Sequence, residues 1–140
     1  MSCRNCNHPL EHGFVDLGFS PPSNSYLKKD DLNGAETSYP LRTYVCDKCW
    51  LVQTEDYTAA EEIFNDEYAY FSSTSQSWLK HASDYVDMIV PRLELNKKSL
   101  VVEIASNDGY LLKNFVEKDI PCLGIEPTLC TAEKARTLGV

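Results

Sequence analysis

The 140-residue chain lacks the features that would place it in a membrane, on a secretory route or on nucleic acid. No apolar run approaches the roughly 20 residues of a membrane-spanning helix, and the opening Met-Ser-Cys-Arg-Asn-Cys does not resemble a signal peptide. Lys and Arg number 13 against 21 Asp and Glu and form no cluster, so a formal charge of −8 opposes binding to a phosphate backbone. We therefore expect a cytoplasmic protein with no membrane and no nucleic-acid partner.

Six cysteines are present, and four of them form two Cys-x-x-Cys pairs. Disulfides are disfavoured in the reducing cytosol, whereas two cysteines three positions apart can hold a tetrahedral ion from a single turn. The pairs Cys3–Cys6 and Cys46–Cys49 therefore predict a closed structural Zn²⁺ site with four thiolate ligands. Because 39 residues separate the pairs, the segment between them must fold back.

Redox and catalytic uses of the cysteine pairs fit the sequence less well. A redox Cys-x-x-Cys normally occurs once, at the start of a helix, and four thiolates leave no open position for a catalytic zinc. His8 and His12 are close enough in sequence to replace a cysteine ligand. Cys122 and Cys130 fit better as small buried residues of a strand and a helix.

The N-terminal part is expected to be a zinc ribbon. Short strands are predicted at 13–17, 41–46 and 51–54, with the second cysteine pair between the last two. A loop is predicted over 18–26 from its glycine and proline content. Strand, metal-binding turn and strand is the usual order in a zinc ribbon.

Two helices are predicted in the middle of the chain. The first is short and covers about 59–65. The second begins at a capping box formed by Ser73 and Gln76 and is ended by Pro91. Apolar residues recur behind that capping box at helical spacing: Trp78, Ala82, Tyr85, Val86 and Ile89.

The last forty residues change character. Two short apolar runs, 100–104 and 122–125, are typical of parallel strands buried on both faces. Helical patterns follow each run, one opening at Gly109 and one over 128–138. This β-α-β-α order is the opening of a doubly wound fold.

The sequence therefore predicts an α+β chain in three parts. A zinc-ribbon-like module covers 1–57, connecting helices cover 58–98, and a truncated Rossmann-like half covers 99–140. Since two strands and two helices enclose only a small core, residues 100–140 should be less stable than residues 1–90, unless they pair with another chain or pack against the zinc module.

A cofactor turn is predicted after the first of these strands. Glu103-Ile-Ala-Ser-Asn-Asp-Gly109 joins a strand to a helix, where a Rossmann-type fold turns around its ligand. Glu126 ends the next strand, about 20 residues on, where an acid can accept hydrogen bonds from ribose hydroxyls. The glycine triad of a dinucleotide site is missing, which favours S-adenosylmethionine over a pyrophosphate. The alternative is an ordinary strand–turn–helix with polar turn residues.

In their order along the chain, five motifs resemble the S-adenosylmethionine-dependent sugar C-methyltransferases, which act on nucleotide-linked keto-deoxysugars. The motifs are Cys-Arg-Asn-Cys at 3–6, Val-Cys-Asp-Lys-Cys-Trp-Leu-Val-Gln at 45–53, Tyr-Ala-Tyr-Phe-Ser-Ser at 68–73, Glu-Ile-Ala-Ser-Asn-Asp-Gly-Tyr-Leu-Leu at 103–112 and Gly-Ile-Glu-Pro at 124–127.

The resemblance implies roles for particular residues. It implies that the four paired cysteines are the zinc ligands and that Asn24 faces the sugar. It also implies a segment around Tyr70 that covers the cofactor and substrate. The residues implied to bind the cofactor are Tyr70, Glu103, Ala105, Ser106, Asn107, Asp108, Gly109, Glu126 and Pro127.

Two departures from the family pattern have consequences. Trp50 stands where a glycine usually follows the second cysteine pair, so we expect a less regular turn there. Family members are much longer, which implies that the rest of the sheet and the His and Tyr of proton abstraction lie beyond Val140. The chain is then expected to be inactive alone and to self-associate or pair with the missing portion. A free-standing zinc-binding interaction module is the alternative.

Overall fold

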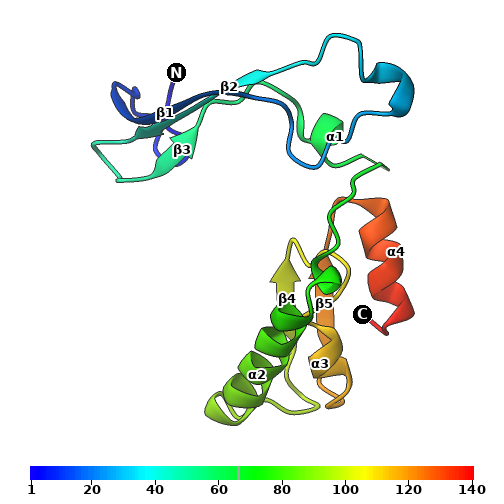
Figure 1. Cartoon of the computed structure of the whole chain (residues 1–140). Helices are drawn as coiled ribbons and strands as arrows, with labels where there is room; N and C mark the ends of the chain where they lie inside the picture. Colours follow the sequence, from blue (N-terminus) through cyan, green and yellow to red (C-terminus); the bar gives the residue numbers. More distant parts are fainter. Residues whose placement is uncertain (66) are drawn as a thin grey trace. The chain divides into compact units, whose positions relative to one another are not determined.

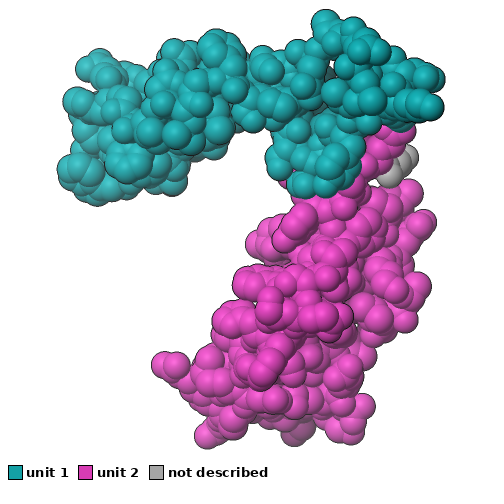
Figure 2. Space-filling view, viewed as in Figure 1, with its two compact units in different colours: residues 1–63 teal, residues 64–140 magenta. Residues whose placement is uncertain are grey.

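The computed structural model describes residues 1–65 and 67–140 of the chain. Within these residues it has four α-helices and two small sheets, which confirms the α+β class. The chain divides into two compact units, unit 1 (Met1–Ile63) and unit 2 (Phe64–Val140), coloured separately in Figure 2. None of the described helices is long and apolar enough to cross a bilayer.

Unit 1 is built on a three-stranded antiparallel sheet in the order β1-β2-β3 (Figure 1). All three strands were predicted, and the pairing of β2 with β3 places the second cysteine pair in the turn between them. The elements of this unit are β1 (His12–Ser20), a 3-10 turn at Lys29–Asp31, β2 (Tyr39–Val45), β3 (Val52–Thr54) and α1 (Ala60–Ile63).

Strand β1 ends at Ser20, three residues beyond the predicted strand end at residue 17. Gly18 adopts the left-handed region, with φ at 79°, and its N–H donates to Asp16 Oδ1 at 2.9 Å. The register against β2 shifts between Asp16 and Phe19, and pairing then resumes to Ser20. A β-bulge therefore absorbs the glycine within the strand.

The core of unit 1 is small and consists largely of its cysteines. Cys3 and Cys46 are fully buried and Leu10 nearly so, with Tyr44 packed against them. Every residue of β1 before Ser20 is exposed. Because so few apolar side chains are buried here, the cysteine cluster has to supply much of what holds the sheet together.

Unit 2 is a β-α-β-α arrangement preceded by a long helix (Figure 1). Strands β4 and β5 pair in parallel, with Val101 opposite Cys122 and Ile104 opposite Ile125. The elements are a 3-10 turn at Ser72–Thr74, α2 (Gln76–Arg92), β4 (Val101–Ile104), α3 (Lys113–Val116), β5 (Cys122–Ile125) and α4 (Leu129–Thr137).

The ends of α2 differ from the predicted ones. Ser75 is the N-cap, since its Oγ accepts the Trp78 N–H at 3.3 Å. The predicted cap, Ser73, instead donates its backbone N–H to Asp108 Oδ2 at 3.1 Å. The helix continues one residue beyond Pro91, to Arg92.

The two parallel strands are covered on one face only, contrary to the prediction of burial on both. Inward-facing Val101 and Cys122 pack against a core from α2, α3 and the following turn: Val86, Leu112, Phe115 and Ile120. The outward-facing side chains are 50–80% exposed: Val102, Ile104, Leu123 and Ile125. The apolar runs are strands, as predicted, but no described element of unit 2 covers their second face.

Candidate metal centre and cofactor turn

The two Cys-x-x-Cys turns of unit 1 have the same backbone geometry. In each turn the first cysteine makes two backbone hydrogen bonds. Its carbonyl oxygen accepts the N–H of the residue four positions later, and its N–H donates to the carbonyl of the residue five positions later. The bonds are Asn7 N to Cys3 O (2.9 Å), Cys3 N to His8 O (2.8 Å), Trp50 N to Cys46 O (2.9 Å) and Cys46 N to Leu51 O (3.0 Å).

The second turn is therefore as regular as the first, and the expectation of a less regular turn at Trp50 is wrong. Trp50 takes the left-handed conformation that a glycine would take, with φ at 65°, as Asn7 does at 58°. Such a φ is unfavourable for a bulky residue. The hydrogen bond to Cys46 maintains the turn in spite of that cost.

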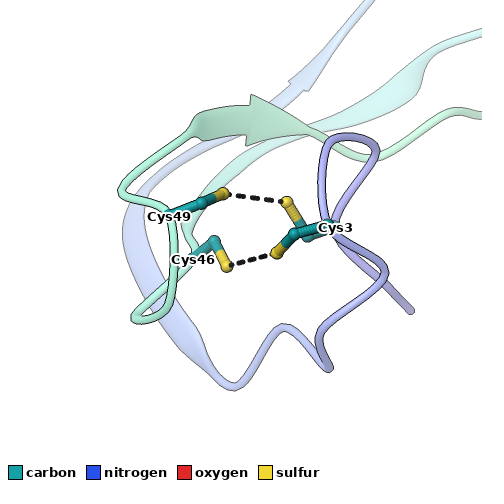
Figure 3. Close-up of side chains that lie close together, drawn as sticks. Cys3, Cys46 and Cys49 are labelled. Carbon is teal, nitrogen blue, oxygen red and sulfur yellow. Dashed lines mark hydrogen bonds between the residues drawn. The ribbon is translucent and has the colours of Figure 1, made fainter.

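The four cysteine side chains of these turns point toward one another. Figure 3 labels three of them, with contacts of 3.5 Å between Cys3 and Cys49 sulfurs and 3.6 Å between those of Cys6 and Cys46. All four sulfurs lie within 4.8 Å of one another, and none is in a disulfide. A tetrahedral ion with Zn–S bonds of about 2.3 Å needs sulfurs about 3.8 Å apart, so the cluster has the right size and donors for Zn²⁺.

The two histidines near the cluster point elsewhere. His8 Nε2 lies 3.2 Å from one carboxylate oxygen of Asp47, and His12 Nε2 lies 3.5 Å from the other. Among the described residues the metal-type cluster contains cysteines alone. His8 in the first turn and His12 at the start of β1 thus both contact Asp47 in the second turn.

Crowding of the four thiols favours a cation between them. Burial acts to raise the pKa of Cys3, but N–H donors from Cys6, Gln53 and Asn5 outweigh it and lower that pKa to about 6. The N–H of His8 acts to lower the pKa of Cys6, yet burial and the neighbouring cysteine sulfurs raise it to about 12. Zn²⁺ at the centre of the cluster would stabilise all four thiolates, including that of Cys6.

In unit 2 the predicted cofactor turn follows β4 and folds over the end of β5. The N–H groups of Ala105 and Ser106 both donate to Ile125 O, at 2.8 and 3.2 Å. Gly124 permits this approach, because a Cβ there would lie 2.5 Å from Ser106 Oγ. Three turn residues have positive φ, at 60°, 49° and 79°: Ala105, Asn107 and Gly109.

Glu126 is tied to that turn. Its two carboxylate oxygens accept the backbone N–H groups of Asn107 and Thr128, each at 2.9 Å. These bonds fix the carboxylate at the carboxyl ends of β4 and β5. A carboxylate has about four acceptor positions, so Glu126 keeps capacity for a further donor.

Side chains of the turn also hold the segment before α2. Asn107 Oδ1 accepts the Ser72 N–H at 2.8 Å, and Asn107 Nδ2 donates to Tyr70 O at 3.1 Å. Asp108 holds Ser73 in the same way. Tyr70 is itself 48% exposed, so its backbone is fixed while its ring is free to contact a ligand.

Three buried oxygens around the turn have no hydrogen-bond partner: Glu103 Oε2, Asp108 Oδ1 and Thr128 Oγ1. Burial raises the pKa of Glu103 to about 7 and also raises the pKa of Tyr110. Buried polar atoms without partners are rare in native structures and indicate a place where another molecule or ion supplies the partner.

The predicted cofactor residues lie around the carboxyl ends of β4 and β5. Residues 106–109 are buried, Glu103 and Glu126 are half-buried, and Tyr70, Ala105 and Pro127 are exposed. Sequence reasoning gave none of Ser72, Ser73, Thr128 and Gln53 a part in either site, although it placed Ser73 in a helix capping box. The first two lie in a motif that carried the resemblance, as does Gln53, so those motifs could have indicated them. Thr128 has no comparable signal beyond following the Glu-Pro pair.

Comparison with known proteins agrees with this description. Residues 3–64 match the sequence model of a family described as "Putative zinc binding domain". Unit 1 is therefore a zinc-binding domain of this class. Over 138 residues, 99% of the chain, the sequence is 33% identical to the C-methyltransferase NovU of Streptomyces niveus. The chain is therefore similar to this C-methyltransferase, and it spans 33% of the length of that relative.

Proposed function

We propose that the chain is the zinc-binding N-terminal portion of an S-adenosylmethionine-dependent C-methyltransferase acting on a nucleotide-linked keto-deoxysugar. Residues 1–57 hold the metal, 58–98 connect, and 99–140 begin the cofactor-binding domain. Cys3, Cys6, Cys46 and Cys49 are the proposed zinc ligands, supported by the mutual approach of their sulfurs. With all four positions filled by thiolates the zinc is structural.

One observation carries the cofactor assignment: three unpartnered buried oxygens surround a turn at the carboxyl ends of two parallel strands, where doubly wound α/β folds bind nucleotides. S-adenosylmethionine brings an amino group and ribose hydroxyls, which are donors, and it supplies a methyl group on a sulfonium centre. Asp108 and Thr128 would accept or orient the donors, and Glu126 would bind the ribose. Tyr70 would cover the ligand from the segment that Asn107 fixes.

The sugar is proposed to approach unit 1 near its proline-rich loop. A hollow of about 250 Å³ lies there, lined by Ser23, Tyr39, Leu41, Tyr57 and neighbouring residues. Asn24, next to Ser23, has a left-handed φ of 60° and is half-buried. Polar tips and aromatic rings around one hollow suit a sugar ring.

The open face of β4 and β5 supports the further proposal that the chain is inactive alone. Apolar strands of a parallel sheet require cover on both faces, and here one face is exposed. Its natural cover would be the portion that the relative has beyond the matched third, or a second copy of this chain.

Calorimetry with S-adenosylmethionine on the zinc-loaded chain tests the cofactor assignment. Binding should be measurable and should be lost in Asp108→Ala and weakened in Glu126→Gln, while exposed Glu133→Gln should bind as the unchanged chain does. Equal affinity in all variants would contradict the assigned site. A methyl-transfer assay with a keto-deoxysugar nucleotide should show no turnover, and clear activity would contradict the proposed inactivity.

A further inference from the structure

Gln53 lies directly beside the cysteine cluster although it is not a ligand. It sits on β3 and is only 6% exposed, which is unusual for a glutamine. A buried amide needs partners for both ends. The partners of its amide oxygen and amide nitrogen therefore indicate the role of the side chain.

Both partners of Gln53 belong to the first cysteine turn. The Arg4 N–H donates to Gln53 Oε1 at 3.1 Å, and Gln53 Nε2 lies 3.3 Å from Cys3 Sγ. Because Arg4 N can only donate, it fixes which end of the amide is oxygen, and the NH₂ group must face the sulfur. The orientation is thus determined by the hydrogen bonds and not by chance.

We propose that Gln53 is a positioning residue of the metal centre, whose side-chain N–H donates to the Cys3 thiolate and holds the first cysteine turn against β3. This inference rests on the proposed role of Cys3 as a zinc ligand. An N–H directed at a thiolate withdraws charge from the sulfur, which stabilises the four-thiolate site and makes Cys3 less reactive toward oxidants. The same bond spans 50 residues of sequence, so it also closes the long segment between the cysteine pairs.

The chain offers variants that separate these effects. Gln53→Glu keeps an oxygen for Arg4 but offers no N–H to the sulfur at neutral pH, and Gln53→Met keeps the length while losing both bonds. Val52 is the matched control, because it neighbours Gln53 on β3 and is 49% exposed, so Val52→Thr leaves the cluster untouched. Zinc affinity is measured on the full chain by competition with a chromophoric chelator.

We expect Gln53→Glu to weaken zinc binding about 10- to 100-fold, as outer-shell substitutions commonly do. Gln53→Met should weaken it in the same direction, and Val52→Thr should not change it. With Co²⁺ in place of zinc, the sulfur-to-metal charge-transfer band should move to lower energy in both Gln53 variants, because a thiolate that loses its hydrogen bond is a better electron donor. A merely structural role would not move that band.

If both Gln53 variants hold zinc as tightly as the unchanged chain and give the same cobalt band, the inference is wrong while the zinc site stands. If the unchanged chain binds no zinc, the proposed metal role fails first and the inference with it.

Should the variants not fold, NMR of the unchanged chain loaded with ¹¹³Cd provides the test. A scalar coupling between the metal and a Gln53 side-chain proton is the expected result, and its absence from a resolved spectrum overturns the proposal.

Discussion

Replacing Glu103 with glutamine should stabilise unit 2 at neutral and alkaline pH. The side chain lies on the covered face of β4, and its Oε2 is buried without a partner. Burial raises its pKa from the ordinary 4.5 to about 7. Glutamine has nearly the same shape and no charge, so it removes the cost of ionisation and leaves the packing in place.

The magnitude follows from that pKa. A carboxyl whose pKa moves from 4.5 to about 7 loses about 3 kcal/mol of folding free energy on full ionisation. The folded pKa lies above the unfolded one, so the favourable contribution is complete below about 4.5 and is lost as the pH rises through about 7. Since Glu103 is only partly buried and water screens it, we expect about 2 kcal/mol in practice.

Urea titrations at pH 5 and pH 8, followed through the amide resonances of α2 and β5, measure this contribution. Unit 2 of the unchanged chain should lose stability between the two pH values, and Glu103→Gln should lose clearly less. Glu133→Gln, which removes an exposed charge from α4, should behave like the unchanged chain. Equal pH dependence in Glu103→Gln and the unchanged chain would show that the carboxylate finds a partner or water in solution.

Three further outcomes are expected. Removing zinc with a chelator should unfold unit 1, since a four-cysteine zinc site contributes on the order of 10 kcal/mol to folding. Amide hydrogen exchange should then rise across residues 1–63. Retained protection there would contradict the metal's structural role. Trp50→Gly should stabilise the zinc-loaded chain by about 1 kcal/mol in urea titration, more than Asn7→Gly, because Asn tolerates a left-handed φ. Gly124→Ala should destabilise unit 2 by about 2 kcal/mol, because the new Cβ would meet Ser106 Oγ at 2.5 Å; an unchanged urea midpoint would show that the turn yields.

Local patterns were enough to predict most elements of this chain. The spacing of four cysteines indicated one metal cluster, and the apolar runs at 100–104 and 122–125 indicated a parallel pair. These predictions held because each depends on neighbours in sequence or on a residue type with one dominant use. The family resemblance then linked them in order.

The errors came where a distant residue decided the outcome. Ser73 has the sequence context of an N-cap, but Asp108, which is 35 residues away, takes its N–H, and Ser75 caps α2 instead. Trp50 was expected to disturb its turn, yet the bond to Cys46 keeps the turn regular. Burial of both strand faces was inferred from composition, which cannot tell whether a covering element belongs to the same chain.

The metal centre and the cofactor turn follow one structural rule. Each needs residues in the left-handed region, and at Trp50 and Ala105 this chain provides side chains that do not favour it. In each case hydrogen bonds from elsewhere in the unit hold the turn: to Cys46 O in the first, and to Ile125 O and Glu126 in the second. Strain that is maintained in this way is concentrated at functional sites. The two turns are therefore better evidence of function than their composition alone, because a turn selected only for stability would have used glycine.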